Sequence, residues 1–119
     1  MQHINAAEFA NRRLDDVFQA LADPTRREML SLLARGETTA GALGAPFKIS
    51  QPAASKHIRM LERAGLVSRN VDGRVHRLRL VSTPLRDAEA WISRHRQFWE
   101  GSLDSLGRAL DEITRGGKA

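Results

Sequence analysis

The chain has 119 residues, of which 19 are basic and 14 are acidic, and a formal net charge of +5. This length suits a single domain with one hydrophobic core. Because the sequence contains no cysteine, it excludes disulfides, thiolate metal ligands and a cysteine nucleophile. No apolar run approaches the roughly 18 residues of a membrane span and no signal peptide is visible, so we expect the protein in the cytoplasm.

The first predicted helix is amphipathic. Its apolar residues recur at intervals of three and four, which places their side chains on one helix face. They are Leu14, Val17, Phe18 and Leu21. Asn5 and Glu8 form a capping pair that favours an earlier start, so the N-terminal boundary of this helix stays open.

The dipeptide Asp23-Pro24 separates this helix from a second one. Asp23 is a favourable N-cap, and Pro24 suits the first helical position, where its missing N–H costs nothing. Arg35 and Gly36 end the helix, with a cation near the negative helix terminus and a glycine beyond it. The inner face consists of Met29, Leu30 and Leu33.

A short third helix and a tight turn follow. Thr39 is a suitable N-cap, Leu43 is an inner apolar residue, and residues 44–46, Gly-Ala-Pro, break the helix. Phe47 and Ile49 anchor the turn into the next helix. A helix, a short break and another helix form the pattern of a helix-turn-helix.

The fourth predicted helix carries the candidate functional face. Ser50 is its N-cap, and Gly65 is its stop signal. The buried face consists of Ala54, Ile58 and Leu61. The opposite face consists of Gln51, Pro52, Ser55, Lys56, Arg59 and Arg63. Recognition helices of helix-turn-helix proteins present such a short, polar and cationic N-terminal end to base edges in the major groove.

Two short strands are predicted next, joined by a hairpin turn at Asp72-Gly73. This turn pairs Val67 with Leu78, so that both side chains face the core, and it places Arg77 opposite Ser68 on the other face. Further basic residues gather near the tip, namely Arg69, Arg74 and His76. A basic hairpin directly after a recognition helix is a wing.

The whole charge excess lies between residues 48 and 80. This segment has eight basic and two acidic residues, whereas residues 1–47 carry a net charge of −1 and residues 81–119 are neutral overall. Such a concentration indicates a footprint for a polyanion. A solvated basic surface is the alternative interpretation, and the helix-turn-helix pattern around the charges argues against it.

Thr83 as N-cap and Pro84 start a long last helix. Five of its apolar residues fall seven apart, and this stripe is longer than a terminal helix needs for packing on a small body. We therefore expect a constitutive homodimer held mainly by the first and last helices. Its predicted interface residues are Leu14, Phe18, Leu85, Ile92, Trp99, Leu106 and Ile113.

Together these elements predict a mainly α fold with a small β-hairpin. The expected architecture is a winged helix-turn-helix of about five helices and a two-stranded wing, in one domain of residues 1–119. The DNA-binding core spans residues 14–81, and the dimerisation helix spans residues 83–114. The core side chains are expected to be Leu30, Leu33, Leu43, Ile58, Leu61, Val67 and Leu78.

Five motifs carry a family resemblance. They are LADPTRR at 21–27, LLARGE at 32–37, SQPAASKHI at 50–58, LERAGLV at 61–67 and Gly73-Arg74 in the wing. In this order of elements they resemble the ArsR family of bacterial winged-helix repressors. The resemblance implies a homodimer that binds a palindromic operator in double-stranded DNA and represses transcription, often of its own gene.

The resemblance also implies roles by position. The base-reading candidates are Gln51, Pro52, Ala53 and Ser55. The candidates for phosphate contacts are Lys56, His57 and Arg59. The candidates for wing contacts in or near the minor groove are Arg69, Arg74, His76 and Arg77. The stretch from Asp23 to Arg26 is expected to be structural, as a cap and a turn.

No metal, cofactor or catalytic site is expected. Founding members of the family sense metals through a cysteine-containing motif on the third helix, which this chain lacks. Others use Asp and His pairs on the last helix, where this chain has only His95, with Asp87 eight residues away. None of the four histidines forms an i, i+3 or i, i+4 pair. No Gly-rich phosphate loop or Ser-His-Asp grouping indicates an enzyme, and no residue pattern identifies an effector.

The leading hypothesis from the sequence is a DNA-binding transcriptional repressor. The alternative is a protein-interaction module that binds a partner through its aromatic C-terminal helix. The local charge of +6 between residues 48 and 80 favours the repressor, because it lies where DNA would bind.

Overall fold

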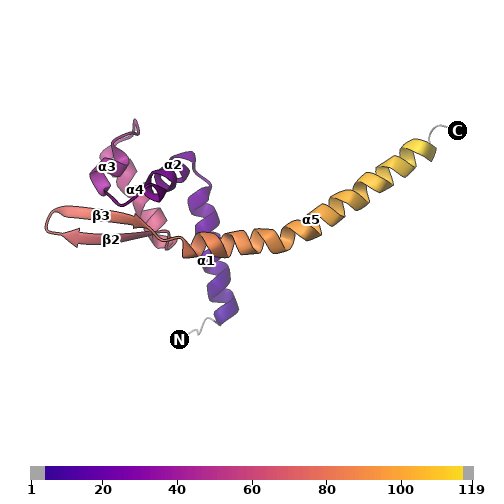
Figure 1. The fold of residues 1–119 in the computed structure, drawn as a ribbon, viewed down its shortest axis with the longest axis horizontal. Helices are drawn as coiled ribbons and strands as arrows, with labels where there is room; N and C mark the ends of the chain where they lie inside the picture. Colours follow the sequence, from indigo (N-terminus) through magenta and orange to yellow (C-terminus); the bar gives the residue numbers. More distant parts are fainter. Residues whose placement is uncertain (1–4, 117–119) are drawn as a thin grey trace. The chain divides into compact units, whose positions relative to one another are not determined.

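The computed structural model describes residues 5–116 (Figure 1). In chain order its elements are α1 (Ala6–Leu21), α2 (Pro24–Ala34), β1 (Thr38–Thr39), α3 (Ala40–Gly44), α4 (Gln51–Arg63), β2 (Val67–Asp72), β3 (Val75–Leu80) and α5 (Thr83–Gly116). Residues 5–88 form one compact unit, and residues 89–116 form a second one, built from the remainder of α5. Across the described range, no helix is both long enough and apolar enough to cross a membrane.

Side-chain caps set the starts of the first four helices. The capping oxygens, each of which accepts a hydrogen bond from the backbone N–H three residues later, belong to Asn5, Asp23, Thr39 and Ser50. All four caps are confirmed, and α1 takes the earlier of its two possible starts. The predicted cap of the last helix is wrong by one residue. The first helical hydrogen bond of α5 runs from the Arg86 N–H to the Ser82 carbonyl at 3.0 Å, so Thr83 already lies inside the helix.

The C-terminal end of α4 reverses the chain into β2. Gly65 has a φ of +75°, a left-handed conformation that glycine adopts without strain. Its N–H donates to the Glu62 carbonyl at 2.9 Å, and the Leu66 N–H donates to the Leu61 carbonyl at 3.0 Å. This pair of bonds is a Schellman motif. Leu61 and Leu66 are both fully buried. The two residues joined by the longer of these bonds are therefore also core residues.

The hairpin turn differs from the predicted one. Asp72 pairs with Val75, so the two turn residues are Gly73 and Arg74. Gly73 has a φ of +61°, and no non-glycine residue of the described chain has a positive φ. This is the pattern of a type II′ turn, which needs glycine only at its first central position. A turn at Asp72-Gly73 of type I′, the type that an Asp-Gly pair favours, would require a positive φ at Asp72 as well.

The changed turn displaces every cross-strand pair by two residues. The observed pairs are Val67–Leu80 and Arg77–Asn70, in place of the predicted Val67–Leu78 and Arg77–Ser68. Because side chains alternate between the faces of a strand, a shift of two residues leaves each one on its expected face. Val67 and Leu78 therefore both reach the core, with exposed fractions of 5% and 0%.

The sheet has a third strand that the sequence pattern does not reveal. β1 pairs with β3, with Thr38 opposite Leu78 and Thr39 opposite Arg77, and the strand order is β1-β3-β2. A strand of two residues is too short to show alternation, so no sequence pattern marks it. The β2–β3 hairpin projects beyond α2, α3 and α4 as the predicted wing (Figure 1).

The core of the first unit lies between these helices and the sheet. All seven side chains expected there are buried, namely Leu30, Leu33, Leu43, Ile58, Leu61, Val67 and Leu78. They are joined by Met29, Val17 and Leu66, among others. The core thus packs the inner face of α4 and leaves its outer face to solvent.

Candidate nucleic-acid interface

The outer face of α4 presents most of the side chains that the sequence predicts for base and phosphate contacts. Those of Gln51, Pro52, Ser55, Lys56 and Arg59 are exposed, and Ala53 is half-buried. The other side of the helix is buried through Ala54, Ile58 and Leu61. Packing of the apolar face therefore aims the polar N-terminal half of α4 away from the protein.

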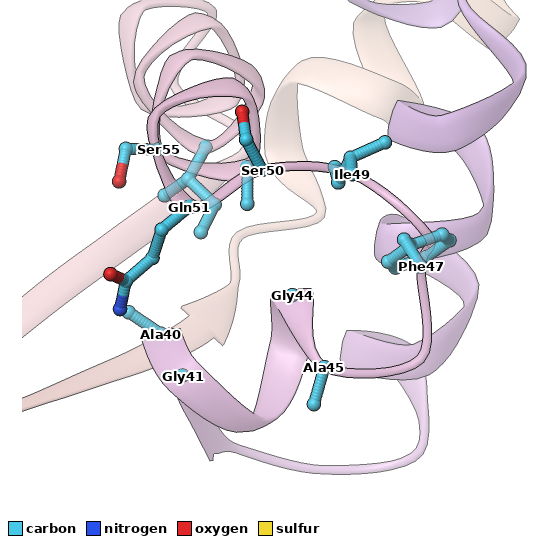
Figure 2. A pocket seen from close by; sticks show the side chains of 11 residues that line it. Ala40, Gly41, Gly44, Ala45, Phe47, Ile49, Ser50, Gln51 and Ser55 are labelled. Atoms are coloured by element: carbon cyan, nitrogen blue, oxygen red, sulfur yellow. The ribbon is translucent and has the colours of Figure 1, made fainter.

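A cavity of about 320 Å³ lies between α3 and the N-terminal half of α4. Figure 2 shows Gln51 reaching from α4 toward Ala40 on one side of this cavity, with Phe47 on the other side. The two helices meet closely at Gly44, where an added Cβ would lie 3.1 Å from the Cβ of Ala54. The glycine thus permits the close crossing of α3 and α4.

The wing divides its four predicted contact residues into two pairs. Arg74 and Arg77 are exposed, and neither makes an ion pair within residues 5–116. Arg69 instead forms a bidentate pair with Glu62 of α4, with Nε–Oε2 at 3.1 Å and Nη2–Oε1 at 2.6 Å. Its Nη1 lies 2.9 Å from Nδ1 of His76.

The Glu62–Arg69 pair joins α4 to β2 of the wing. Its hydrogen bonds to Glu62 raise the pKa of the Arg69 guanidinium above its ordinary value. Because a guanidinium can only donate, Nδ1 of His76 must be the acceptor and carries no proton in this contact. Arg69 and His76 are therefore held between α4, β2 and β3, and the charge of Arg69 is partly balanced by Glu62.

A second carboxylate–arginine–histidine cluster contacts the middle of α4. Nη1 of Arg26 lies 3.1 Å from Nδ1 of His57, and the Asp23 carboxylate lies 3.9 Å from the same nitrogen. The pKa of Asp23 is lowered, first by the hydrogen bond from the backbone N–H of Arg26 and further by the nearby charge of the Arg26 guanidinium. His57 is half-buried here, apart from the exposed face that carries Ser55 and Arg59.

Asp23→Ala should lower the free energy of unfolding by about 0.5–2 kcal/mol, because the first turn of α2 loses its cap. Asp23→Asn should retain most of the cap and lose only the charge. Since the folded pKa of Asp23 lies below its unfolded value, the charge stabilises the fold above the unfolded pKa, and this contribution is lost as the pH falls through the folded pKa. Urea unfolding at about pH 7 and at about pH 3, at one protein concentration, measures both effects. Equal stability of Asp23→Ala and wild type would contradict the cap assignment.

The predicted dimer residues fall into two groups. Leu14, Phe18 and Leu85 are half-buried and pack against the core of the first unit. The remaining four lie on α5 and are exposed, with exposed fractions of 38% for Ile92, 48% for Trp99, 56% for Leu106 and 70% for Ile113. The apolar surface available to a second molecule is thus concentrated on α5.

Aromatic rings follow this stripe within the second unit. Trp91 stacks on His95 with ring centroids 4.1 Å apart, and it meets Trp99 edge-on at 5.9 Å. Nδ1 of His95 lies 2.8 Å from the Trp91 carbonyl, to which it donates. His95 is therefore part of an aromatic ladder. Between residues 5 and 116 no group of three or more His, Asp or Glu side chains is placed to hold a metal ion.

Two partners in the polar clusters are not predicted as functional residues by the sequence. The sequence pattern gives no role to Glu62, and it gives Arg26 only a place in a cap and turn. Arg26 and His57 are 31 residues apart in sequence, and no local spacing rule joins them. Glu62 carries a weak signal, because it is one of only two acidic residues among the eight basic ones between residues 48 and 80.

Comparison with known proteins extends this description. A family model described as a helix-turn-helix domain matches residues 21–70. The transcriptional repressor SdpR of Bacillus subtilis is 38% identical over 79 residues, which are 66% of this chain and 88% of that protein. The crystal structure of an ArsR family transcriptional regulator has a TM-score of 0.72 and 39% identity, and the match covers 76% of this chain and 93% of that one.

A more distant structure shares the fold. It is the solution structure of a homodimeric winged helix-turn-helix DNA-binding domain from Mycobacterium bovis, 23% identical with a TM-score of 0.59. The match covers 88% of this chain and 95% of that chain. The predicted winged helix-turn-helix fold is therefore confirmed.

Proposed function

The chain belongs to the ArsR family of transcriptional regulators, and from this premise we propose that it represses transcription as a homodimer bound to a palindromic operator. It is a DNA-binding repressor by family. The observation that carries the finer proposal is the exposed polar N-terminal half of α4, whose opposite face is locked into the core. We place the protein in the cytoplasm with its DNA, and autoregulation is one expected mode of action.

In this proposal α4 is the recognition helix. Gln51, Pro52, Ala53 and Ser55 read base edges in the major groove, and Gln51 is suited to a bidentate contact with adenine. The Gln51 side chain is exposed, which leaves its amide accessible to a base edge. Sequence preference at the operator thus depends on the first two turns of α4.

Exposed cations supply the phosphate contacts. Among the exposed cations that the sequence predicts as DNA contacts, four make no ion pair in the described chain, namely Lys56, Arg59, Arg74 and Arg77. The sequence also suggests His57, Arg69 and His76 as contacts to DNA. Their side chains make hydrogen bonds within the protein, so we assign them a structural role instead. We therefore assign phosphate binding to the first group.

The homodimer is supported by the apolar stripe of α5. Several large apolar side chains exposed along one helix would be an unusual surface for a monomer. A two-fold axis would also serve recognition, because it sets two recognition helices about 34 Å apart, one turn of DNA. The palindromic site follows from the same symmetry.

Operator affinity should fall steeply with salt concentration. Each neutralised phosphate contributes about −0.9 to the slope of log K against log salt. Four cations on each subunit make about eight contacts per dimer, which gives a slope of about −7. Fluorescence anisotropy with a duplex selected from random DNA measures the slope between about 50 and about 200 mM salt. A flat response would contradict DNA binding and favour the protein-interaction alternative.

A pair of variants separates the two kinds of contact. Arg74→Ala should weaken selected and scrambled duplexes alike and make the slope shallower by about 1–2. Gln51→Ala should keep the slope and relax discrimination at one position per half-site by roughly 1–3 kcal/mol. If both variants behaved alike, the division into phosphate and base contacts would be wrong.

A further inference from the structure

Arg26 is the one buried charged side chain of the described residues, with an exposed fraction of 8%. A buried charge is costly unless hydrogen bonds satisfy it. The guanidinium of Arg26 donates from Nε to the Ala20 carbonyl at 2.8 Å, from Nη2 to the Gln19 carbonyl at 2.9 Å, and from Nη1 to Nδ1 of His57 at 3.1 Å. A single side chain thus touches both α1 and α4 from its place on α2.

The two carbonyls belong to the last turn of α1. Carbonyls at a helix C-terminus lack partners inside the helix, and a cation is favourable there because of the helix dipole. These contacts fix the guanidinium firmly against the end of α1. The remaining Nη1 donor is then aimed at α4, and His57 is the side chain that receives it.

His57 lies on the inner side of the recognition helix. A step of two residues along a helix turns it by about 200°, so His57 points nearly opposite to Ser55 and Arg59. Because the guanidinium only donates, Nδ1 of His57 must be unprotonated while it accepts this bond. His57 therefore supports α4 from behind the face that is assigned to DNA.

The hydrogen bond between Arg26 and His57 is directional, so it can restrain the orientation of α4 in a way that apolar packing cannot. Ala54, Ile58 and Leu61 bury the inner face of α4, but hydrophobic contacts tolerate small rotations and slides of a helix. A bidentate contact to a base does not tolerate them, since it depends on donor and acceptor geometry. The Arg26–His57 bond restrains the rotation of α4 relative to the end of α1.

We propose that Arg26 is a positioning residue for operator recognition, which acts through Nδ1 of His57. This inference rests on the proposed function, because it concerns how α4 is presented to DNA. It predicts that loss of the bond lowers sequence discrimination more than it lowers general affinity for DNA. A purely structural role would instead reduce the folded fraction and weaken selected and scrambled duplexes equally.

The test compares affinities for a selected and a scrambled duplex by fluorescence anisotropy. In His57→Leu the ratio of the two affinities should fall by about tenfold, the scale of one altered base contact. In His57→Asn the amide oxygen can take the place of Nδ1, and the ratio should stay within about threefold of wild type. An unchanged ratio in His57→Leu would overturn the proposal, as would a loss in His57→Asn as large as in His57→Leu.

Arg27 offers a matched control for Arg26. Arg27 also donates to a carbonyl at the end of α1, that of Leu21 at 2.7 Å, but within residues 5–116 its side chain makes no hydrogen bond to α4. Arg26→Leu should therefore lower the ratio, whereas Arg27→Leu should leave it unchanged. Equal behaviour of the two variants would overturn the role of the link to α4. Failure to select any preferred duplex would instead refute the proposed function, whereas an unchanged affinity ratio in His57→Leu overturns only the role of Arg26.

Discussion

Trp99→Glu should convert the protein to a monomer and abolish specific binding to the operator, although it leaves the recognition helix unchanged. Trp99 lies in the middle of the α5 stripe and is 48% exposed in the single chain. About half of the surface of this side chain is left to bury, roughly 100 Å², which at about 25 cal/mol per Å² is worth about 2–3 kcal/mol for each of the two copies before ordering costs. A carboxylate in its place would have to be desolvated without a partner.

Sedimentation equilibrium at micromolar concentration measures the first effect, and anisotropy with the selected duplex measures the second. Gln97→Glu is the matched control, because it introduces the same charge at an exposed position about 160° around the helix from Trp99. The control should remain dimeric and bind DNA. A wild-type monomer at micromolar concentration would contradict the dimer and, with it, the palindromic operator.

Loss of operator binding should follow from loss of the dimer for a physical reason. When one recognition helix is bound, a dimer holds the second helix at a high effective concentration next to the second half-site. A monomer has only the contacts of one half-site. Trp99→Glu should therefore retain weak, salt-sensitive binding to any duplex, since Lys56, Arg59, Arg74 and Arg77 are untouched.

Local chemistry explains which parts of the fold were predictable from sequence. A cap acts over three residues, so Asp23 and Ser50 mark helix starts wherever the chain folds. Helical periodicity likewise identifies the inner face of α4, because burial repeats every three or four residues. These short-range signals are sufficient to locate the recognition helix and its exposed face from the amino-acid sequence.

Features that depend on distant partners were not predictable in the same way. Asp72-Gly73 and Gly73-Arg74 both satisfy a glycine-containing hairpin rule, and the choice between them is made by the whole β2–β3 pairing. Which cations of the wing are paired within the protein also depends on distant residues. The sequence predicts Arg69 as a free wing cation, but the fold places its guanidinium against Glu62. Charge counts alone cannot separate paired cations from unpaired ones.

Leu61→Ala should lower the free energy of unfolding by about 2–5 kcal/mol, the range for truncating a buried leucine. Leu61 has an exposed fraction of 0%, and it belongs to the core formed by α4, the sheet and the neighbouring helices. Urea unfolding at one protein concentration measures the loss, since dimer formation makes the apparent stability depend on concentration. Arg63→Ala, an exposed substitution on the same helix, should change the stability by less than about 0.5 kcal/mol.

The loss of stability in Leu61→Ala should lie toward the upper part of that range, because Leu61 belongs both to the core and to the C-terminal cap of α4. Its carbonyl accepts the Leu66 N–H in the Schellman motif, and both side chains are fully buried next to that bond. A cavity at Leu61 would therefore loosen the contact that accompanies the cap and, through it, the entry into β2. Leu30→Ala removes a buried leucine that is not part of a cap, and it should cost less. If Leu61→Ala cost no more than Leu30→Ala, the cap would add nothing to the role of this side chain in joining the recognition helix to the wing.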